Sequence, residues 1–178
     1  MIKVIKIFLR FSNFSVFFTV MSALNCATFD YNQLDSMGMT ALHHVCASRG
    51  LDLARIPIDL ASLSIEASTT KIVKTEDRLK VLNFLLDNNA CIDIQASNGK
   101  TPLHFACYNG YLEIIDRLLE RGADTTITCR EEFDFDISCV VFNLPAQGLG
   151  VAYGRHNILP IFEKYGKLTT GAVTGQYT

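Results

Sequence analysis

The sequence lacks tryptophan and has only 4 prolines among its 178 residues. It also lacks a Cys-x-x-Cys pair, a Gly-rich phosphate loop and a nucleophile elbow, the short motifs that most often indicate a metal site or an active site. We therefore expect no enzyme activity, no cofactor and no bound metal. Apolar residues make up 49% of the chain and charged residues 19%, which excludes a wholly disordered protein. The length suits one domain.

The net charge of −2 conceals an uneven distribution. Residues 1–27 contain Lys3, Lys6 and Arg10 and no acid, whereas the remainder carries 13 basic and 18 acidic side chains. A body of negative charge does not attract phosphate backbones, so nucleic acid is excluded as the expected partner.

The amino-terminal segment, residues 1–27, has a basic start, an apolar stretch and small residues around 23–27. This order is typical of a secretory signal peptide. An uncleaved membrane anchor, an organelle-targeting peptide and a true start at Met21 stay open as alternatives. If residues 1–27 are a leader that is removed, we expect a secreted or periplasmic protein. Otherwise we expect a cytoplasmic protein. Contact with a membrane is expected only if residues 1–27 stay uncleaved. A mature mass that begins near residues 24–28 would indicate cleavage.

Two blocks of the sequence occur twice. GMTALHHVC at 38–46 matches GKTPLHFAC at 99–107 with a shift of 61 residues, and LKVLNFLLD at 79–87 matches LEIIDRLLE at 112–120 with a shift of 33. The difference of 28 residues indicates an insertion between the two halves of the first copy. A period of 33 and the pattern Thr-Pro-Leu-His-x-Ala belong to ankyrin repeats. The chain therefore resembles an ankyrin-repeat protein over roughly residues 30–166.

This resemblance implies an all-α fold, a solenoid of stacked antiparallel helix pairs with connecting loops or β-hairpins. We expect the repeat domain at 28–166 and a flexible tail at 167–178. Repeat 1 spans about 37–94 with an insertion at about 51–77, repeat 2 spans about 98–128, and a degenerate repeat 3 spans about 130–166. The insertion is either a surface loop or an apolar segment, 53–65, that folds back over the core.

The signature residues have structural reasons for their positions. Thr101 is a good helix N-cap, Pro102 suits the first helical position, and Gly110 ends the helix. We expect helices at 101–109 and 111–121, and another from Thr75 to Asn88. The stacked helix pairs are expected to share one hydrophobic spine that contains Leu42, Leu85, Leu103 and Leu118. The repeat signature comprises Thr40, Leu42, His43, Thr101, Pro102, Leu103, His104, Gly110 and Gly122. The resemblance implies that its two histidines hydrogen-bond to backbone between neighbouring loops.

The third copy is only partly legible. Ile137, Val140 and Val141 predict its first helix. Ile158, Leu159 and Phe162 predict its second, which ends at Gly166. A long connection, 144–154, would then join the two helices. Because repeats stack in parallel, we expect this connection and the insertion in repeat 1 to leave the stack along the same edge.

The six cysteines show no paired spacing. Cys46 and Cys107 fall at small, buried helix positions, whereas Cys91, Cys129 and Cys139 become disulfide candidates if the protein is exported. His43 and Cys46 are one helical turn apart, but no second pair completes a metal site. The acidic run at 131–136 is either a solvated loop with two anchoring aromatic residues or a contact for a basic partner.

The resemblance implies a non-catalytic module that binds another protein, whose identity the sequence does not give. Alternatives are an exported effector or protective factor that acts on a host or envelope protein, and a metal-binding or enzymatic protein on the same scaffold. Positions that the family exposes for partner binding correspond here to His44, Ser48, Ser97, Asn98, Lys100, Phe105, Tyr108 and Asn109. Among them, Phe105 and Tyr108 are the expected energetic anchors.

Overall fold

The computed structural model describes residues 30–47, 51–52, 71–72, 75–135 and 138–168. The expectations for the leader, for the apolar segment 53–65, for Ser48 and for most of the tail lie outside these residues. Of the helices described, none has both the length and the apolar character that a membrane crossing requires.

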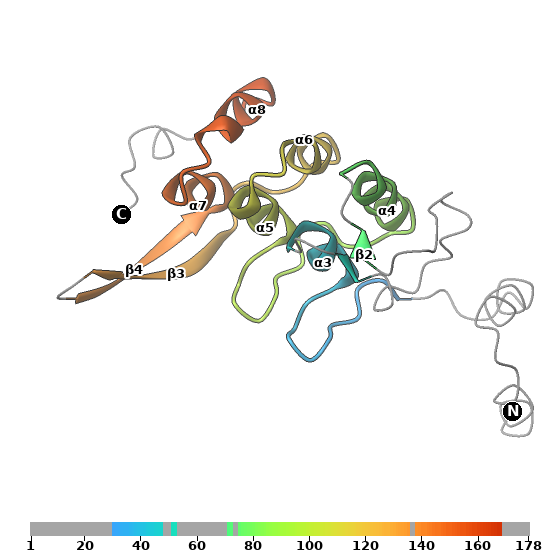
Figure 1. Cartoon of the computed structure of the whole chain (residues 1–178), viewed down its shortest axis with the longest axis horizontal. Coiled ribbons are helices and arrows are strands. Elements are labelled where there is room, and N and C mark those ends of the chain that lie inside the picture. The colour runs from blue at the N-terminus through green and yellow to red at the C-terminus, as the bar shows by residue number, and fades with distance from the viewer. Residues whose placement is uncertain (1–29, 48–50, 53–70, 73–74, 136–137, 169–178) are drawn as a thin grey trace, which may run out of the picture.

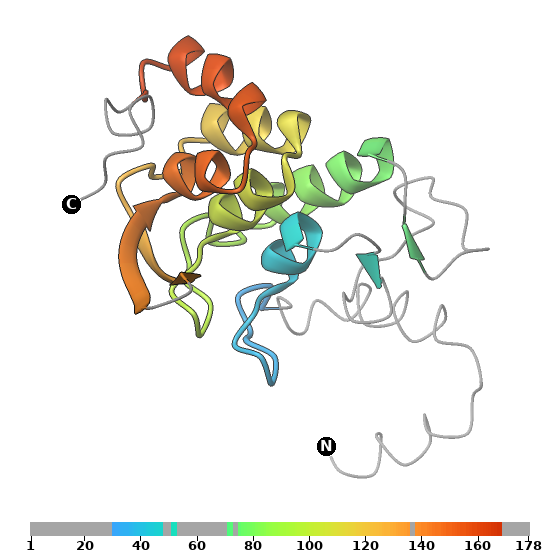
Figure 2. The same cartoon turned by 60° about the vertical axis from the view of Figure 1, so that its left-hand side comes forward.

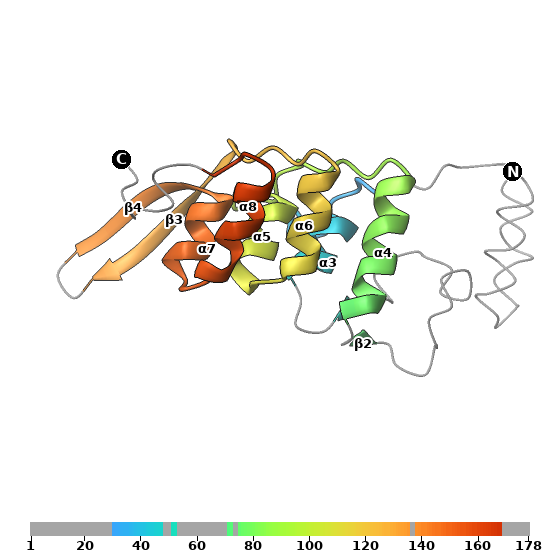
Figure 3. The same cartoon turned by 90° about the horizontal axis from the view of Figure 1, so that it is seen from above.

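In the described part of the chain, six α-helices form three pairs, arranged in two layers (Figure 1). One layer contains α3 (Ala41–Ala47), α5 (Pro102–Asn109) and α7 (Ala146–Ala152) side by side. The other contains α4 (Thr75–Asp87), α6 (Leu112–Glu120) and α8 (Leu159–Lys164), with the short 3-10 helix η2 (His156–Ile158) before α8. Seen from above, the second helices α4, α6 and α8 succeed one another along the molecule (Figure 3).

A continuous core lies between the two layers. The four leucines expected to form its spine are fully buried in one cluster, which confirms that prediction: Leu42, Leu85, Leu103 and Leu118. Phe162 of α8 is also fully buried there and brings the third helix pair into the same core. Burial of this apolar area is the main favourable contribution to folding.

The helix ends follow the local chemistry of the sequence. α4 begins at Thr75 with Glu76 and Asp77 in its first turn, where acids favour the positive end of the helix dipole. The same acids in the sequence predict that the insertion stops near Thr75, and α4 begins at that residue. After α4, Asn89 adopts a left-handed conformation with φ of 63°, as Gly122 does after α6 with φ of 88°.

The third helix pair corrects the sequence prediction. Residues 138–145 form a strand, so the helix expected from Ile137, Val140 and Val141 is wrong. The first helix is instead α7, within the stretch interpreted as a long connection. The second helix was predicted correctly, because α8 covers Leu159–Lys164 and Gly166 follows it with φ of 63°.

Within the described residues, two antiparallel strand pairs join successive helices, which agrees with the connecting β-hairpins that the resemblance implies. β1 (Leu51–Asp52) and β2 (Lys71–Ile72) pair at the base of the insertion. β3 (Thr128–Phe135) and β4 (Ser138–Pro145) form a longer ribbon, paired from Thr128 and Pro145 to Phe135 and Ser138. We call residues 128–135 and 138–145 the β3–β4 ribbon; it projects beyond the helices (Figures 1 and 3).

Two loops that we call fingers precede α3 and α5: the first finger is residues 30–40 and the second is residues 91–101. Each closes on the same turn, in which Asp35 or Ala96 donates its N–H to the carbonyl four residues later at 2.9 Å. Both fingers and the β3–β4 ribbon extend from the layer of first helices (Figures 1 and 2). The second excursion expected at 144–154 is wrong, because Ala146–Ala152 form α7. The excursion in repeat 3 is instead the ribbon, which precedes α7, whereas β1 follows α3, so the two leave at opposite ends of the first helices.

Candidate functional site

The two signature histidines connect neighbouring repeats. In α5, the Nδ1 atom of His104 accepts the N–H of Thr101 at 3.2 Å, and its Nε2 donates to the carbonyl of Leu144 at 3.2 Å. His43 makes the same contacts with Thr40 and with the carbonyl of Lys100, both at 3.1 Å. Burial lowers the pKa of each imidazole to about 4, which keeps it neutral. The predicted backbone role of these histidines is confirmed.

Asn109 joins adjacent repeats. Its side-chain nitrogen lies 3.2 Å from the carbonyl oxygen of Cys46, 3.1 Å from that of Ala47 and 2.9 Å from that of Phe105. The first two carbonyls belong to the end of α3 and lack helical partners. The structure thus uses Asn109 to join α5 to α3, although the resemblance placed it among the partner-binding residues.

Phe105 is half-buried, with its ring edge-on to that of His43 at a centroid distance of 5.7 Å. It packs against the core cluster, which makes it a contact between repeats. The tip of the second finger is more open. Ser97 and Asn98 are exposed there, and Asn98 Oδ1 accepts the N–H of Lys100 at 3.1 Å.

The first finger carries apolar side chains at its tip. Leu34 is 51% exposed and Met37 is 61% exposed. Asp35 fixes the loop behind them, since its carboxylate accepts the N–H groups of Met37 and Met39 and lies 2.7 Å from Nε2 of His44. The bond from Met39 is the main cause of a lowered Asp35 pKa. His44 therefore supports the finger.

Four residues from four elements meet beside the second finger, and we call them the tyrosine surface: Lys100, Tyr108, Glu131 and Tyr153. Glu131 of β3 connects them, because it pairs with Lys100 Nζ at 2.7 Å and accepts the Tyr153 hydroxyl at 2.7 Å. The rings of Tyr108 and Tyr153 meet edge-on with centroids 4.5 Å apart. Lys100 Nζ lies 5.7 Å from the centre of the Tyr108 ring.

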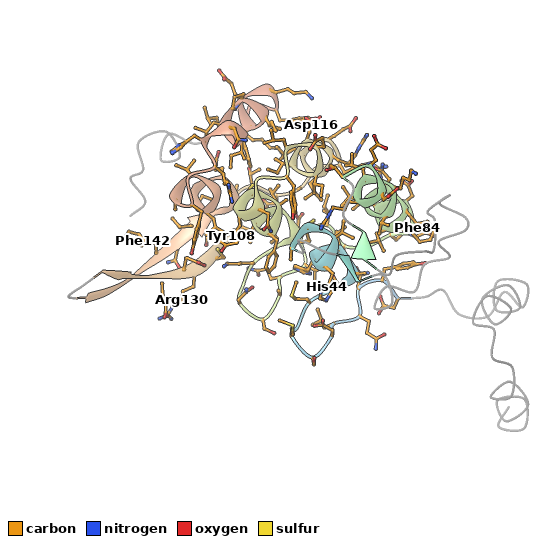
Figure 4. The ribbon with its side chains drawn as sticks, in the orientation of Figure 1. His44, Phe84, Tyr108, Asp116, Arg130 and Phe142 are labelled. Atoms are coloured by element: carbon orange, nitrogen blue, oxygen red, sulfur yellow. The ribbon has the colours of Figure 1, made fainter. Side chains whose placement is uncertain are left out.

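The tyrosine surface combines fixed polar groups with exposed aromatic rings. Lys100 and Glu131 are 15% and 13% exposed, so they form a largely buried ion pair. The bond to Glu131 is the main cause that raises the pKa of Tyr153 to about 12. Tyr108 and Tyr153 are nevertheless 39% and 38% exposed. In Figure 4, Tyr108 and His44 lie on the finger side of the molecule, whereas Asp116 lies on the second helix layer.

Sequence reasoning missed Tyr153 and Arg155. Tyr153 directly follows α7, a helix that the sequence pattern did not predict. Arg155 lies two residues further on, and its Nε donates to the carbonyl of Tyr108 at 3.3 Å. A signal was present, because Gly154 and Gly166 are twelve residues apart, as are Gly110 and Gly122 that end α5 and its partner. That shared spacing would have located both helices of repeat 3.

The acidic run does not form a free acidic loop. Its residues up to Phe135 belong to β3, and both oxygens of Glu131 are already engaged by Lys100 and Tyr153. Glu132 is 59% exposed on its side chain and lies 3.5 Å from Arg130.

Over the described residues, no group of three or more side chains is arranged to hold a metal ion. Four cysteines whose side chains the structure describes are free thiols: Cys46, Cys91, Cys107 and Cys129. Cys46 and Cys107 are fully buried as predicted, and burial raises the pKa of both thiols. Burial also raises the pKa of Cys129 to about 11. These three thiols are therefore protonated at neutral pH and unreactive.

Residues 67–129 match the family model described as ankyrin repeats (3 copies). The matched range begins in the insertion, contains α4, α5 and α6, and ends in β3, so α7 and α8 lie beyond it.

Three relatives illustrate the similarity. A 59-residue stretch, 33% of this chain, is 37% identical to palmitoyltransferase AKR1 of Lachancea kluyveri, of which it covers 8%. A 50-residue stretch, 28% of the chain, is 40% identical to the mouse serine/threonine-protein kinase TNNI3K, of which it covers 6%. A 98-residue match, 55% of the chain, is 31% identical to human BCL-6 corepressor-like protein 1 and covers 4% of it.

The chain thus spans less than a tenth of the relatives it matches. The two enzymes among them are similar to it only through their ankyrin regions, and ankyrin repeats are generally non-catalytic. Their enzymatic names therefore give no reason to assign this chain a reaction.

Proposed function

This chain carries ankyrin repeats at residues 67–129, and from that premise we propose that it is a non-catalytic module that binds another protein. Its repeats, extended by α7 and α8, form a short solenoid. The proposed contact surface consists of the tips of the two fingers and the tyrosine surface, all on the side of the first helices. A solenoid offers such an extended face to a protein partner.

The observation that carries this proposal is where the exposed apolar side chains lie. Within the described residues, five large hydrophobic side chains are exposed: Leu34, Met37, Tyr108, Tyr153 and Leu168. The first two belong to the first finger and the two tyrosines to the ends of first helices, so only Leu168 lies elsewhere. Exposed apolar groups gathered on one face are typical of interaction sites, and tyrosine is enriched among interface residues that dominate affinity.

The tyrosine surface is also held in place before any partner binds. Glu131 holds Lys100 from the second finger and Tyr153 from the end of α7, while Arg155 holds the backbone of Tyr108. Side chains that are already ordered lose less conformational entropy on binding, so more of the contact free energy appears as affinity.

The test is affinity capture with a variant that removes both rings. We expect the double variant Tyr108→Ala, Tyr153→Ala to retain its fold and to lose at least tenfold in affinity for the partner that the unaltered chain captures. Quantitative mass spectrometry identifies that partner, and binding of the purified partner gives the affinity. The matched control is Leu168→Ala, which removes an exposed apolar side chain away from the surface. Unchanged affinity of the folded double variant would refute the proposed surface.

A further inference from the structure

The β3–β4 ribbon has two chemically different faces. Strand residues alternate between faces, and the pairing of Cys129 with Leu144 and of Phe133 with Val140 fixes which positions share a face. One face takes mostly apolar positions: Cys129, Glu131, Phe133, Phe135, Ser138, Val140, Phe142 and Leu144. The other takes mostly polar ones: Thr128, Arg130, Glu132, Asp134, Cys139, Val141, Asn143 and Pro145. Figure 4 shows Arg130 and Phe142 on opposite sides of the ribbon.

Among the described helices, α7 packs against the apolar face at its base. Cys129 and Leu144 are buried there with Leu149 of α7, and Phe142 is partly buried against them. The positions of Phe133 and Phe135 continue the same face toward the turn, where the ribbon extends past α7 (Figures 1 and 3). The far half of the ribbon therefore has a sequence suited to a buried sheet face, and none of the helices that the structure describes extends over it (Figures 1 and 3).

The two edges of the ribbon differ in charge. In the part of the chain that the structure describes, β3 has β4 as its one strand neighbour, and α7 lies against β4. The charged residues of the polar face are all on β3, namely Arg130, Glu132 and Asp134, whereas β4 contributes no Asp, Glu, Lys or Arg. Since Arg130 lies beside Glu132, an excess of negative charge remains along β3 toward the turn.

We infer that residues 132–135 of β3 form an edge for strand addition, which accepts an extended segment of a partner protein in which apolar and basic residues alternate. The added strand extends the sheet by main-chain hydrogen bonds. Its apolar side chains then lie on the face of Phe133 and Phe135, and its basic side chains lie beside Glu132 and Asp134, where cross-strand pairs of opposite charge are favourable. This inference rests on the proposed function and names the chemistry of the partner.

Charge also argues against the two obvious alternatives. Two antiparallel copies of β3 that pair through residues 132–134 would set Glu132 of one copy opposite Asp134 of the other, which is unfavourable. A strand added beside β4 would gain no charge pair, and Pro145 has no N–H to donate.

The test uses the full chain and synthetic peptides of alternating sequence, followed by fluorescence anisotropy. We expect a heptapeptide of alternating valine and lysine to bind at least tenfold more tightly than one of alternating valine and glutamate. Methylation of alternate backbone amides in the valine–lysine peptide keeps its charge but removes the hydrogen bonds of one edge. This change is expected to lower affinity at least tenfold.

Variants of the chain locate the site. The double variant Glu132→Lys, Asp134→Lys is expected to lose valine–lysine binding, whereas the matched control Glu113→Lys, Glu163→Lys changes two exposed acids elsewhere by the same charge and retains it. Absence of binding, equal binding of the methylated peptide, or equal loss in the control variant would each overturn the inference.

The Tyr108→Ala, Tyr153→Ala variant separates the two proposals, because its defect is expected in partner capture and not in peptide binding at the ribbon.

Discussion

The imidazole of His104 in α5 donates a hydrogen bond to the carbonyl of Leu144, forty residues further along the chain. This bond attaches the last residues of β4 to the start of the preceding first helix, while the other ring nitrogen accepts the N–H of Thr101. One side chain therefore holds both a helix N-terminus and the base of the ribbon.

Replacement of His104 removes both of these contacts. We expect His104→Ala to lower the free energy of unfolding by about 2 kcal/mol, since a helix cap and a buried hydrogen bond each contribute about 1 kcal/mol. Chemical denaturation measures the loss, and hydrogen exchange should show faster exchange in β4 than in α4. His156→Ala serves as a control because that histidine is exposed. A His104 variant as stable as the control would show that the bond contributes nothing.

Stability is expected to fall in mild acid. The pKa values of His43 and His104 are lowered to about 4 in the folded protein, while an unfolded histidine titrates near 6.5. As the pH falls, the histidines of the unfolded state therefore take up protons before those of the folded state. The stabilisation that the two neutral histidines give is fully present above pH 6.5 and is lost as the pH falls toward 4. Each histidine contributes about 3 kcal/mol to this loss.

Urea denaturation at pH 7.5 and at pH 4.5 measures this dependence. The double variant His43→Gln, His104→Gln is expected to be less stable at pH 7.5. Its free energy of unfolding is expected to change less between the two pH values than that of the unaltered chain. An equally steep profile in that variant would assign the acid sensitivity to other groups. The carboxylates of Asp35, Asp116 and Asp124 have pKa values lowered below their usual range, so their contribution is lost at still lower pH.

Gly150 of α7 stands where repeat 2 has Ala106, yet alanine does not fit there. An added Cβ would collide with the Ile158 side chain and lie 3.1 Å from the carbonyl oxygen of Cys107. We expect Gly150→Ala to destabilise the protein by about 2 kcal/mol despite the better helix propensity of alanine, since overpacking outweighs that gain. Thermal unfolding measures the change, with the exposed Glu163→Ala as the control; a more stable Gly150 variant would contradict the expected clash.

The ion pair of Lys100 and Glu131 is largely buried, unlike the exposed pairs on the helices. A double-mutant cycle with Lys100→Met and Glu131→Gln is expected to give a coupling free energy of about 1 kcal/mol. The exposed pair of Arg121 and Asp87 is the comparison, and its coupling is expected to be a few tenths of a kcal/mol. Equal couplings would mean that burial does not strengthen the first pair.

The sequence predicted the first two repeats well because pattern and local chemistry agree there. Thr101, Pro102 and Gly110 each favour a helix boundary at the position that the structure confirms. The apolar spacing of Leu85 and Leu118 likewise indicated the buried face of the second helices, as observed.

The third repeat could not be located by assuming the 33-residue period. Gly154 and Gly166 lie 44 residues after Gly110 and Gly122, so the β3–β4 ribbon lengthens the connection by 11 residues. Val140 and Val141 are β-branched and favour a strand, while the glycines of α7 disfavour a helix. Packing against α5, β4 and η2 therefore favours the helical form of α7 over its weak local propensity.

The partner-binding residues were harder to predict than the fold. Asn109 and Phe105 have the residue types of an interface, but in the fold they connect repeats. Tyr153 and Glu131 join Lys100 through contacts between distant parts of the chain, which no local pattern encodes.

The pairing of Leu51 with Ile72 has a practical consequence for protein engineering. It also places Asp52 opposite Lys71, so the two residues that flank positions 53–70 are neighbours across a strand pair. A fluorescent or enzymatic reporter whose own termini are adjacent could be spliced between Asp52 and Lys71 without stretching the stack. The fingers, at the opposite ends of the first helices, would stay free.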